Sequence, residues 1–254
     1  MFNDKEYFEV NREERHYGNL LISSIIFDDG FRDYFFNLVN NKLGKPDFLT
    51  DDFDLYTETA ILRDYWFDLG DYKKIPPQKL NIPRREVINL FFDYFDIDKT
   101  IIEENSFFWS TKINQGYLNF PGKWTERANL KALSYIEQKY LIPGRKLHRI
   151  GWAFNAKPDL LIISNENCLM IEIKLESDTG KNEYGYDQGE TQKDITDFMR
   201  LSIPCFKDKN FEHRFIKKHV KSSDDISWTE IIKYTNNLNN RIIKKHLLRN
   251  KIIG

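Results

Sequence analysis

The clearest pattern along the chain is a pair of short apolar runs at residues 157–164 and 168–176, separated by a polar turn. Runs of this length, rich in Ile and Leu and bounded by turn residues, are typical of buried β-strands. We therefore predict a β-hairpin at this point of the chain, with its turn centred on Asn165 and Glu166.

Helical spacing of apolar residues dominates much of the rest of the sequence. The aromatic side chains of the first hundred residues are expected to pack as the core of several helices. The last expected helix opens with a capping box formed by Ser227 and Glu230. Alternation of apolar and polar residues predicts a third strand at 145–154. The expected helices are 11–27, 31–41, 57–70, 83–95, 125–140, 190–201 and 227–251.

Composition divides the chain near residue 100. The first hundred residues hold 20 acidic and 13 basic side chains, whereas residues 201–254 hold 5 acidic and 12 basic ones. We predict an acidic, aromatic-rich helical accessory region at 1–100 and an α/β domain at 101–254 with a basic C-terminal helix. The basic residues at 201–254 could bind a nucleic acid or could simply form a solvated surface. The acidic region at 1–100 suits a protein partner.

Several functional classes are excluded by what the sequence lacks. No apolar run reaches the roughly 18 residues of a membrane span, and the first residues do not have the pattern of a secretory signal. The sequence has no P-loop, no dinucleotide-binding glycine motif, no HExxH and no nucleophile elbow. Cys168 and Cys205 do not form a CxxC pair, so we expect reduced thiols and a cytoplasmic location.

Three charged residues stand out in the predicted hairpin, because a charge on an apolar strand is costly unless it is paired, hydrogen-bonded or bound to a metal. A two-residue turn would pair Ser164 with Asn167, whereas a three-residue turn would slip the register by one and put Asp159 on the other face. We prefer the first register because it brings the charges together. Asp159 then falls opposite Glu172, and Lys174 shares the face of Glu172. Two adjacent carboxylates repel each other unless a cation lies between them, and Mg²⁺ takes such oxygen ligands. A structural ion pair at the edge of the sheet is the alternative.

The combination of Pro158-Asp159, twelve intervening residues and Glu172-Ile173-Lys174 resembles the PD-(D/E)XK nuclease superfamily. The resemblance covers about residues 124–205 and implies a restriction-endonuclease-like fold, an α/β architecture with a mixed central sheet flanked by helices. It implies that Asp159, Glu172 and the backbone carbonyl of Ile173 bind Mg²⁺ or Mn²⁺. It also implies that Lys174 is the catalytic lysine.

Two further site residues follow from the same resemblance. Many members carry an acidic residue on the helix before the sheet, and Glu126 fits that position, with Glu137 as the weaker candidate. Some members carry a glutamine on the following helix, where Gln192 is the first choice and Gln188 the second. The exonuclease branch places a tyrosine four residues after that glutamine, but this chain has Thr196 there, a departure from the exonuclease pattern.

The resemblance implies a metal-dependent nuclease that hydrolyses DNA, and we expect an endonuclease in a restriction or phage-defence setting. RNA stays open as a substrate, and a homodimer would present two sites to the two strands of a duplex. The alternative is a non-catalytic nucleic-acid-binding or assembly subunit with the same fold. The lysines expected to contact nucleic-acid phosphates are Lys181, Lys217, Lys218, Lys244 and Lys245.

Overall fold

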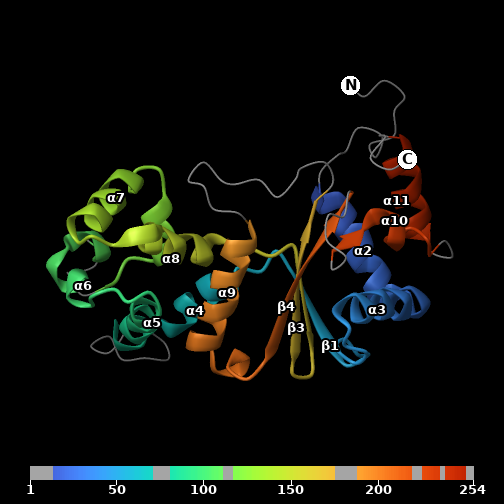
Figure 1. Cartoon of the computed structure of the whole chain (residues 1–254), viewed down its shortest axis with the longest axis horizontal. Coiled ribbons are helices and arrows are strands. Elements are labelled where there is room, and N and C mark those ends of the chain that lie inside the picture. Colours follow the sequence, from blue (N-terminus) through green and yellow to red (C-terminus); the bar gives the residue numbers. More distant parts are fainter. Residues whose placement is uncertain are drawn as a thin grey trace. The chain divides into compact units, whose positions relative to one another are not determined.

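The structure is a computed structural model of the chain, and it describes residues 14–70, 81–110, 117–174, 188–218, 225–234 and 238–249 (Figure 1). The chain folds into two compact units. The first, called here the sheet unit, combines Met1–Thr59, Pro158–Asn182 and Asn210–Gly254. The second, called the helical unit, combines Ala60–Lys157 and Glu183–Lys209. This division differs from the predicted one, because the first hundred residues are shared between the two units.

A mixed β-sheet forms the centre of the sheet unit and confirms the α/β class. Within the described residues it has five strands in the order β1-β2-β3-β4-β5 (Figure 1). The first three strands are antiparallel neighbours, whereas β3, β4 and β5 run parallel. The strands are β1 (Phe53–Thr57), β2 (Leu160–Ser164), β3 (Asn167–Ile173), β4 (Asn210–Lys217) and β5 (Ile226–Ser227).

The predicted hairpin is confirmed as β2 and β3, with the predicted register. Ser164 pairs with Asn167 across a two-residue turn. Asn165 takes a left-handed conformation there, with φ of 50°, which asparagine tolerates better than most residues. Continuing the same register one position beyond the start of β2 places Asp159 opposite Glu172.

Helices pack against one face of this sheet (Figure 1). They are α2 (Glu14–Phe27), α3 (Asp29–Leu43), α10 (Trp228–Ile231) and α11 (Leu238–Arg249). Alternate residues of β3, Leu169, Ile171 and Ile173, join the buried core that these helices form with the sheet. Because side chains alternate along a strand, Glu172 points to the opposite face.

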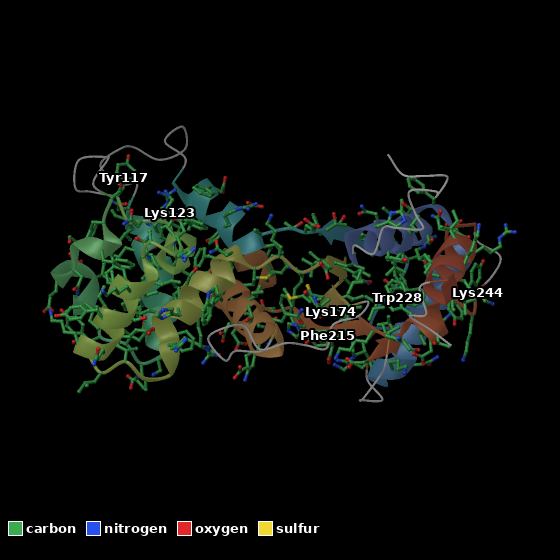
Figure 2. All side chains as sticks on the ribbon, turned by 90° about the horizontal axis from the view of Figure 1, so that it is seen from above. Tyr117, Lys123, Lys174, Phe215, Trp228 and Lys244 are labelled. Atoms are coloured by element: carbon green, nitrogen blue, oxygen red, sulfur yellow. The ribbon has the colours of Figure 1, made fainter. Side chains whose placement is uncertain are left out.

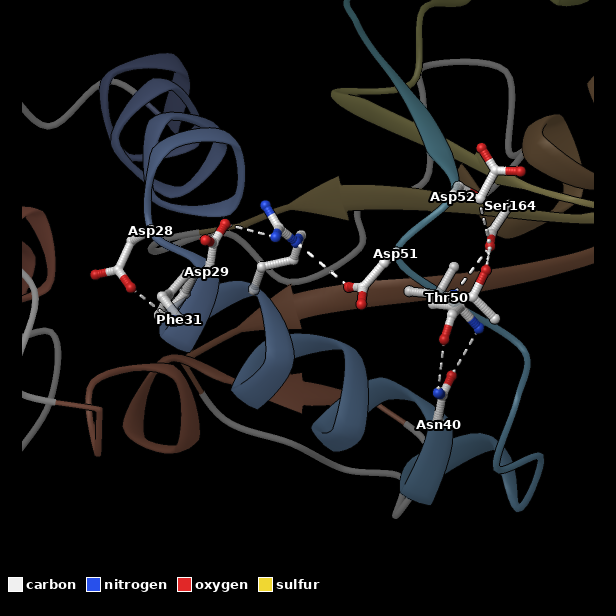
Figure 3. A network of polar contacts seen from close by, with 10 residues as sticks. Asp28, Asp29, Phe31, Asn40, Thr50, Asp51, Asp52 and Ser164 are labelled. Atoms are coloured by element: carbon white, nitrogen blue, oxygen red, sulfur yellow. Dashed lines mark hydrogen bonds and ion pairs between the residues drawn. The ribbon is translucent and has the colours of Figure 1, made fainter.

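Polar contacts fix the segment that leads from α3 into β1 (Figure 3). The amide of Asn40 donates to the carbonyl of Leu49 at 3.0 Å and accepts from its N–H at 2.9 Å. The N–H of Thr50 then donates to the hydroxyl of Ser164 at 2.9 Å. These bonds satisfy backbone groups outside regular structure and hold the start of β1 beside the end of β2.

The helical unit has an aromatic core, as expected from the sequence. Phe91 stacks on Phe198 with ring centroids 4.1 Å apart, and Trp66 meets Phe154 edge to face at 5.7 Å. No described helix of the chain is long and apolar enough to cross a membrane. The α-helices of this unit are α4 (Ile61–Leu69), α5 (Asn81–Tyr94), α6 (Thr100–Glu104), α7 (Leu130–Lys139), α8 (Lys146–Asn155) and α9 (Gln188–Ser202).

The strand predicted at 145–154 is wrong, because this segment forms α8. Its buried residues Leu147, Ile150 and Phe154 recur at helical spacing. The alternation of apolar and polar residues that suggested a strand extends over only a few positions. Two real strands carry too weak a pattern to be predicted. In β1 three of the five residues are exposed, and in β4 only Ile216 is fully buried.

Two predicted helices also need correction. The helix expected at 125–140 begins only at Leu130. The segment 227–251, expected to be one helix, contains the separate helices α10 and α11.

The capping box at the start of α10 is confirmed. The hydroxyl of Ser227 accepts from the N–H of Glu230 at 3.1 Å, and the carboxylate of Glu230 accepts from the N–H of Ser227 at 2.9 Å. Lys42 lies 2.9 Å from the same carboxylate. Burial acts to raise the pKa of Glu230, but the N–H of Ser227 and the ammonium of Lys42 outweigh it, and the pKa is lowered overall.

Glu230→Gln is expected to lower the free energy of unfolding near neutral pH by a few tenths to about 1 kcal/mol. A carboxyl whose pKa is lowered by folding contributes fully above its unfolded value of 4.5, and this contribution is lost as the pH falls through the folded-state value. Urea denaturation should therefore show a constant gap between wild type and variant near neutrality, and a narrower gap as the pH falls below about 4. An equal gap at both pH values would contradict this assignment.

Candidate functional site

The charged residues of the hairpin gather at the end of the hairpin that lies away from its turn. Asp159 directly precedes β2, Glu172 is the second-to-last residue of β3, and Lys174 directly follows β3. The antiparallel neighbour β1 ends close by, because Thr57 pairs with Leu160. The predicted hairpin register therefore brings Asp159, Glu172 and Lys174 to one end of the sheet.

Glu172 and Lys174 form an ion pair. The ammonium of Lys174 lies 3.1 Å from a carboxylate oxygen of Glu172, and their side chains are 11% and 12% exposed, respectively. Removing two charges this far from water is costly, and their mutual attraction offsets the cost only when geometry and further hydrogen bonds are favourable. A buried ion pair is thus weak evidence for a stabilising role by itself.

Asp159 is oriented by the backbone of β3. Its Oδ2 accepts a hydrogen bond from the N–H of Ile173 at 2.7 Å. The N–H and C=O of one residue in a strand point to the same side, so the carbonyl of Ile173 also faces the side of Asp159. The N–H of Lys174 points the other way and donates to the carbonyl of Ile216 on β4 at 2.8 Å. The site therefore presents a carboxylate and a carbonyl oxygen on the same side of β3.

A cavity of about 150 Å³ adjoins this pair of oxygen donors. Such a volume has room for several water molecules, each of which takes roughly 30 Å³. The cavity lies on the α2 side of the sheet, whereas Glu172 points to the opposite face. Glu58 contributes to its wall in a left-handed conformation with φ of 46°. The lining residues are Gly18, Asn19 and Ile22 of α2, Thr57 and Glu58 after β1, Asp159, and Ile173.

Trp228 supports the site from within the core, and sequence reasoning missed it. Its indole N–H donates to the carbonyl of Lys174 at 3.1 Å, and its side chain is completely buried (Figure 2). Tyr17 packs edge to face on its ring at 6.0 Å. The N–H of Lys174 is bonded to Ile216 and its C=O to Trp228, so both polar groups of its backbone are held by hydrogen bonds. The only signal in the sequence is a large aromatic residue beside the capping box.

The structure does not place Glu126 where the resemblance expected it. Glu126 is an exposed residue in a bend between a 3₁₀ turn and α7, not a helical residue. It belongs to the helical unit, whereas the helices that precede the sheet in its own unit are α2 and α3. The weaker candidate Glu137 is buried and accepts hydrogen bonds from the N–H groups of Leu147 and His148, which stabilises the start of α8.

The glutamine candidates lie on α9 of the helical unit. Gln192 is buried, with 4% of its surface exposed, and Thr196 bonds to its backbone carbonyl. The side chain of Gln188 lies outside the described part of the structure.

The predicted nucleic-acid-binding lysines are spread over the sheet unit. Lys217 is the last residue of β4, and Lys218 follows it directly. Lys244 and Lys245 are exposed on α11, and Lys244 lies well apart from Lys174 (Figure 2). Lys181 lies outside the described residues.

The donor set at this site fits Mg²⁺ or Mn²⁺. Across the described ranges, no group of three or more His, Cys, Asp or Glu side chains is close enough to hold a metal ion on its own. Mg²⁺ does not require such a cage, because it is usually bound by one or two carboxylates and keeps several waters. Asp159, Glu172 and the carbonyl of Ile173 are donors of this kind.

The described residues define an α/β protein with a mixed sheet that carries two carboxylates and a lysine at one end. No family model matches the chain, and neither does any curated protein or solved structure. The geometry of the site is therefore the basis for a functional proposal.

Proposed function

We propose that the protein is a divalent-metal-dependent nuclease of the PD-(D/E)XK type, which hydrolyses DNA phosphodiester bonds as an endonuclease. The observation that carries the proposal is the position of Asp159, Glu172 and Lys174 at one end of an antiparallel hairpin. The mixed sheet and the order of elements along the chain support it. In the sequence, α2 and α3 precede β1, and α9 follows β3 and precedes its parallel neighbour β4. A role in restriction or phage defence, with a homodimer as the working form, is part of this proposal.

Each residue has a definite task in this chemistry. Asp159, Glu172 and the carbonyl of Ile173 would hold Mg²⁺ or Mn²⁺, which when bound lowers the pKa of water and stabilises charge on a phosphate. The ammonium of Lys174 would donate to the phosphate oxygen that gains charge, or orient the attacking water. The attacking water would lose a proton to solvent as its oxygen bonds to phosphorus, the bond from phosphorus to the leaving sugar oxygen would break, and that oxygen would take a proton from solvent.

The held backbone of Lys174 supports this assignment. A lysine side chain is flexible, and its contribution to catalysis depends on how well its ammonium is placed before the reaction. Here the N–H and C=O of Lys174 are both bonded, and its ammonium lies against Glu172. The backbone bonds fix where the side chain of Lys174 starts, and the contact with Glu172 restricts the rotamers that its ammonium can adopt.

Metal-dependent cleavage of circular plasmid by the wild type is the expected result, with Lys174→Ala slower by about 10²–10³-fold. Both proteins are incubated with circular and linear DNA in Mg²⁺ or Mn²⁺, with a chelator in parallel, and the products are separated on a gel. Cutting of circles shows an endonuclease, whereas attack on linear DNA alone shows an exonuclease. No cutting of either DNA, or equal cutting by Lys174→Ala, would overturn the proposal, and an RNA substrate in the same assay tests the other nucleic acid.

A second candidate function is a non-catalytic nucleic-acid-binding or assembly subunit. The observation that favours it is the 3.1 Å contact between Glu172 and Lys174, because each charge already compensates the other without a metal ion. Against it stands Asp159, a further carboxylate at the same end of the hairpin, which the N–H of Ile173 orients. A measurement of Mg²⁺ or Mn²⁺ binding distinguishes the two functions, because the nuclease should bind the ion and the non-catalytic subunit should not.

A further inference from the structure

A second lysine lies beside Lys174 on the neighbouring strand. In the parallel register of β3 and β4, Glu172 pairs with Phe215 and Ile173 with Ile216. The N–H of Lys174 continues this ladder by donating to the carbonyl of Ile216, which makes Lys217 the register partner of Lys174. Paired residues of neighbouring strands present their side chains on the same face.

The side chain of Lys217 is held in place by two contacts. Its ammonium lies 3.0 Å from a carboxylate oxygen of Asp225 and 4.1 Å from the centroid of the Phe215 ring. The other oxygen of Asp225 accepts weakly from the N–H of Phe215 at 3.4 Å. Phe215 itself is the register partner of Glu172 and shares its face. Lys217 therefore lies at the end of β4, on the face of the sheet that carries Glu172 and Lys174.

Lys174 and Lys217 are adjacent cations, and each forms an ion pair with its own carboxylate. Like charges directly opposite one another destabilise a sheet, and Glu172 and Asp225 offset this cost for Lys174 and Lys217, respectively. An ammonium has three N–H donors, so a carboxylate partner leaves it able to donate to a phosphate as well. The side chain of Lys217 is 17% exposed.

Two lysines on neighbouring strands suit a nucleic-acid strand. Neighbouring β-strands lie about 4.8 Å apart, every phosphate of a DNA strand carries a negative charge, and the long, flexible side chains of lysine can adjust their reach to neighbouring phosphates. Two ammonium groups on adjacent strands can thus contact consecutive phosphates, one at the point of cleavage and one next to it.

We infer that Lys217 is a substrate-binding residue of this site, which holds the phosphate adjacent to the one that Lys174 contacts. This inference rests on the proposed nuclease function and extends it to how the site holds the strand being cut. Asp225 and Phe215 act as positioning residues for Lys217. Lys217 contributes to substrate affinity, whereas Lys174 contributes to the chemical step.

Lys217→Ala is expected to raise KM about tenfold, with a much smaller change in kcat, whereas Lys217→Arg keeps most of the affinity. A fluorescent DNA duplex with Ca²⁺ in place of Mg²⁺ gives binding without reliance on turnover. In a salt titration of that binding, log K falls as log salt rises. For Lys217→Ala the magnitude of this slope should be smaller by about 1, because one phosphate contact is lost.

The matched control is Lys42→Ala. Lys42 is also a lysine in an ion pair, 2.9 Å from Glu230, with 19% of its side chain exposed, but it lies in the last turn of α3. A Lys217→Ala variant with the KM and salt slope of Lys42→Ala would overturn the inference, while metal-dependent cutting by the wild type would leave the proposed function standing. A wild type that neither cuts nor binds DNA would overturn both. If the wild type binds without cutting, the salt slope alone decides the role of Lys217.

Discussion

Glu172→Gln is expected to lower metal-dependent cleavage by at least about 10²–10³-fold and to weaken Mn²⁺ binding by more than about 100-fold. The first figure is the usual effect of losing one group that stabilises charge in a transition state. The second follows because even the partners behind a metal ligand typically change affinity 10–100-fold when they are removed. Gel assays of cleavage and isothermal calorimetry with Mn²⁺ measure the two quantities.

Thermal unfolding gives an independent readout of the same site. A ligand that binds only the folded state stabilises it by about 2.7 kcal/mol at a concentration 100 times its Kd, so Mn²⁺ should raise the Tm of the wild type. Glu172→Gln should lose this rise. A structural ion pair predicts the opposite pattern, in which Mn²⁺ does not change the Tm of the wild type and the variant is simply less stable.

Glu212→Gln is the matched control for Glu172→Gln. Glu212 is a carboxylate of the same sheet that also contacts cations, with Lys45 at 2.6 Å and Arg214 at 3.3 Å. Its replacement removes one charge from the sheet unit without touching the hairpin end, and it should leave Mn²⁺ binding unchanged. Equal losses of Mn²⁺ binding in both variants would show that general charge, rather than the proposed ligand, is responsible.

Trp228→Ala is expected to lower the free energy of unfolding by about 3–5 kcal/mol, the largest stability effect we predict. The side chain is fully buried in the core between the sheet and its helices, so its removal leaves a cavity. It also leaves the carbonyl of Lys174 without its indole donor. Urea denaturation followed by circular dichroism measures the change.

Trp228→Phe separates packing from hydrogen bonding. Phenylalanine keeps much of the ring volume but has no N–H, so a loss of about 1–3 kcal/mol is expected from the carbonyl of Lys174. Because that bond holds the backbone of Lys174, the same variant should also cut DNA more slowly at temperatures where it is fully folded. A Trp228→Ala variant that loses less than about 1 kcal/mol would contradict the assignment of Trp228 as a core residue.

The part of the candidate site that lies within the hairpin could be predicted because its geometry is local. A two-residue turn determines which residues of β2 and β3 pair, and that register brings Asp159 opposite Glu172. Alternation along β3 then places Lys174 on the face of Glu172. Only the residues from 159 to 174 are needed, so no information from distant parts of the chain enters.

The errors occur where local pattern and tertiary packing disagree. The segment 145–154 alternates over a few residues but packs as α8, since the neighbouring helices bury Leu147, Ile150 and Phe154 at helical spacing. The strand β1 has few buried residues, and its state depends on pairing with β2, more than a hundred residues away. The helical position predicted for Glu126 is wrong, because α7 begins only at Leu130 and Glu126 lies in a bend before it.

The sequence alone determined the α/β class, most of the helices and the charged end of the hairpin, since these depend on periodicity, capping and a short turn. Only the tertiary structure decided the order of the sheet, the cavity beside Asp159, the bond from Trp228 to Lys174 and the place of Lys217 beside Lys174. These features join residues tens to hundreds of positions apart. Such contacts are selected by burial of the whole core, which no local stretch of sequence encodes.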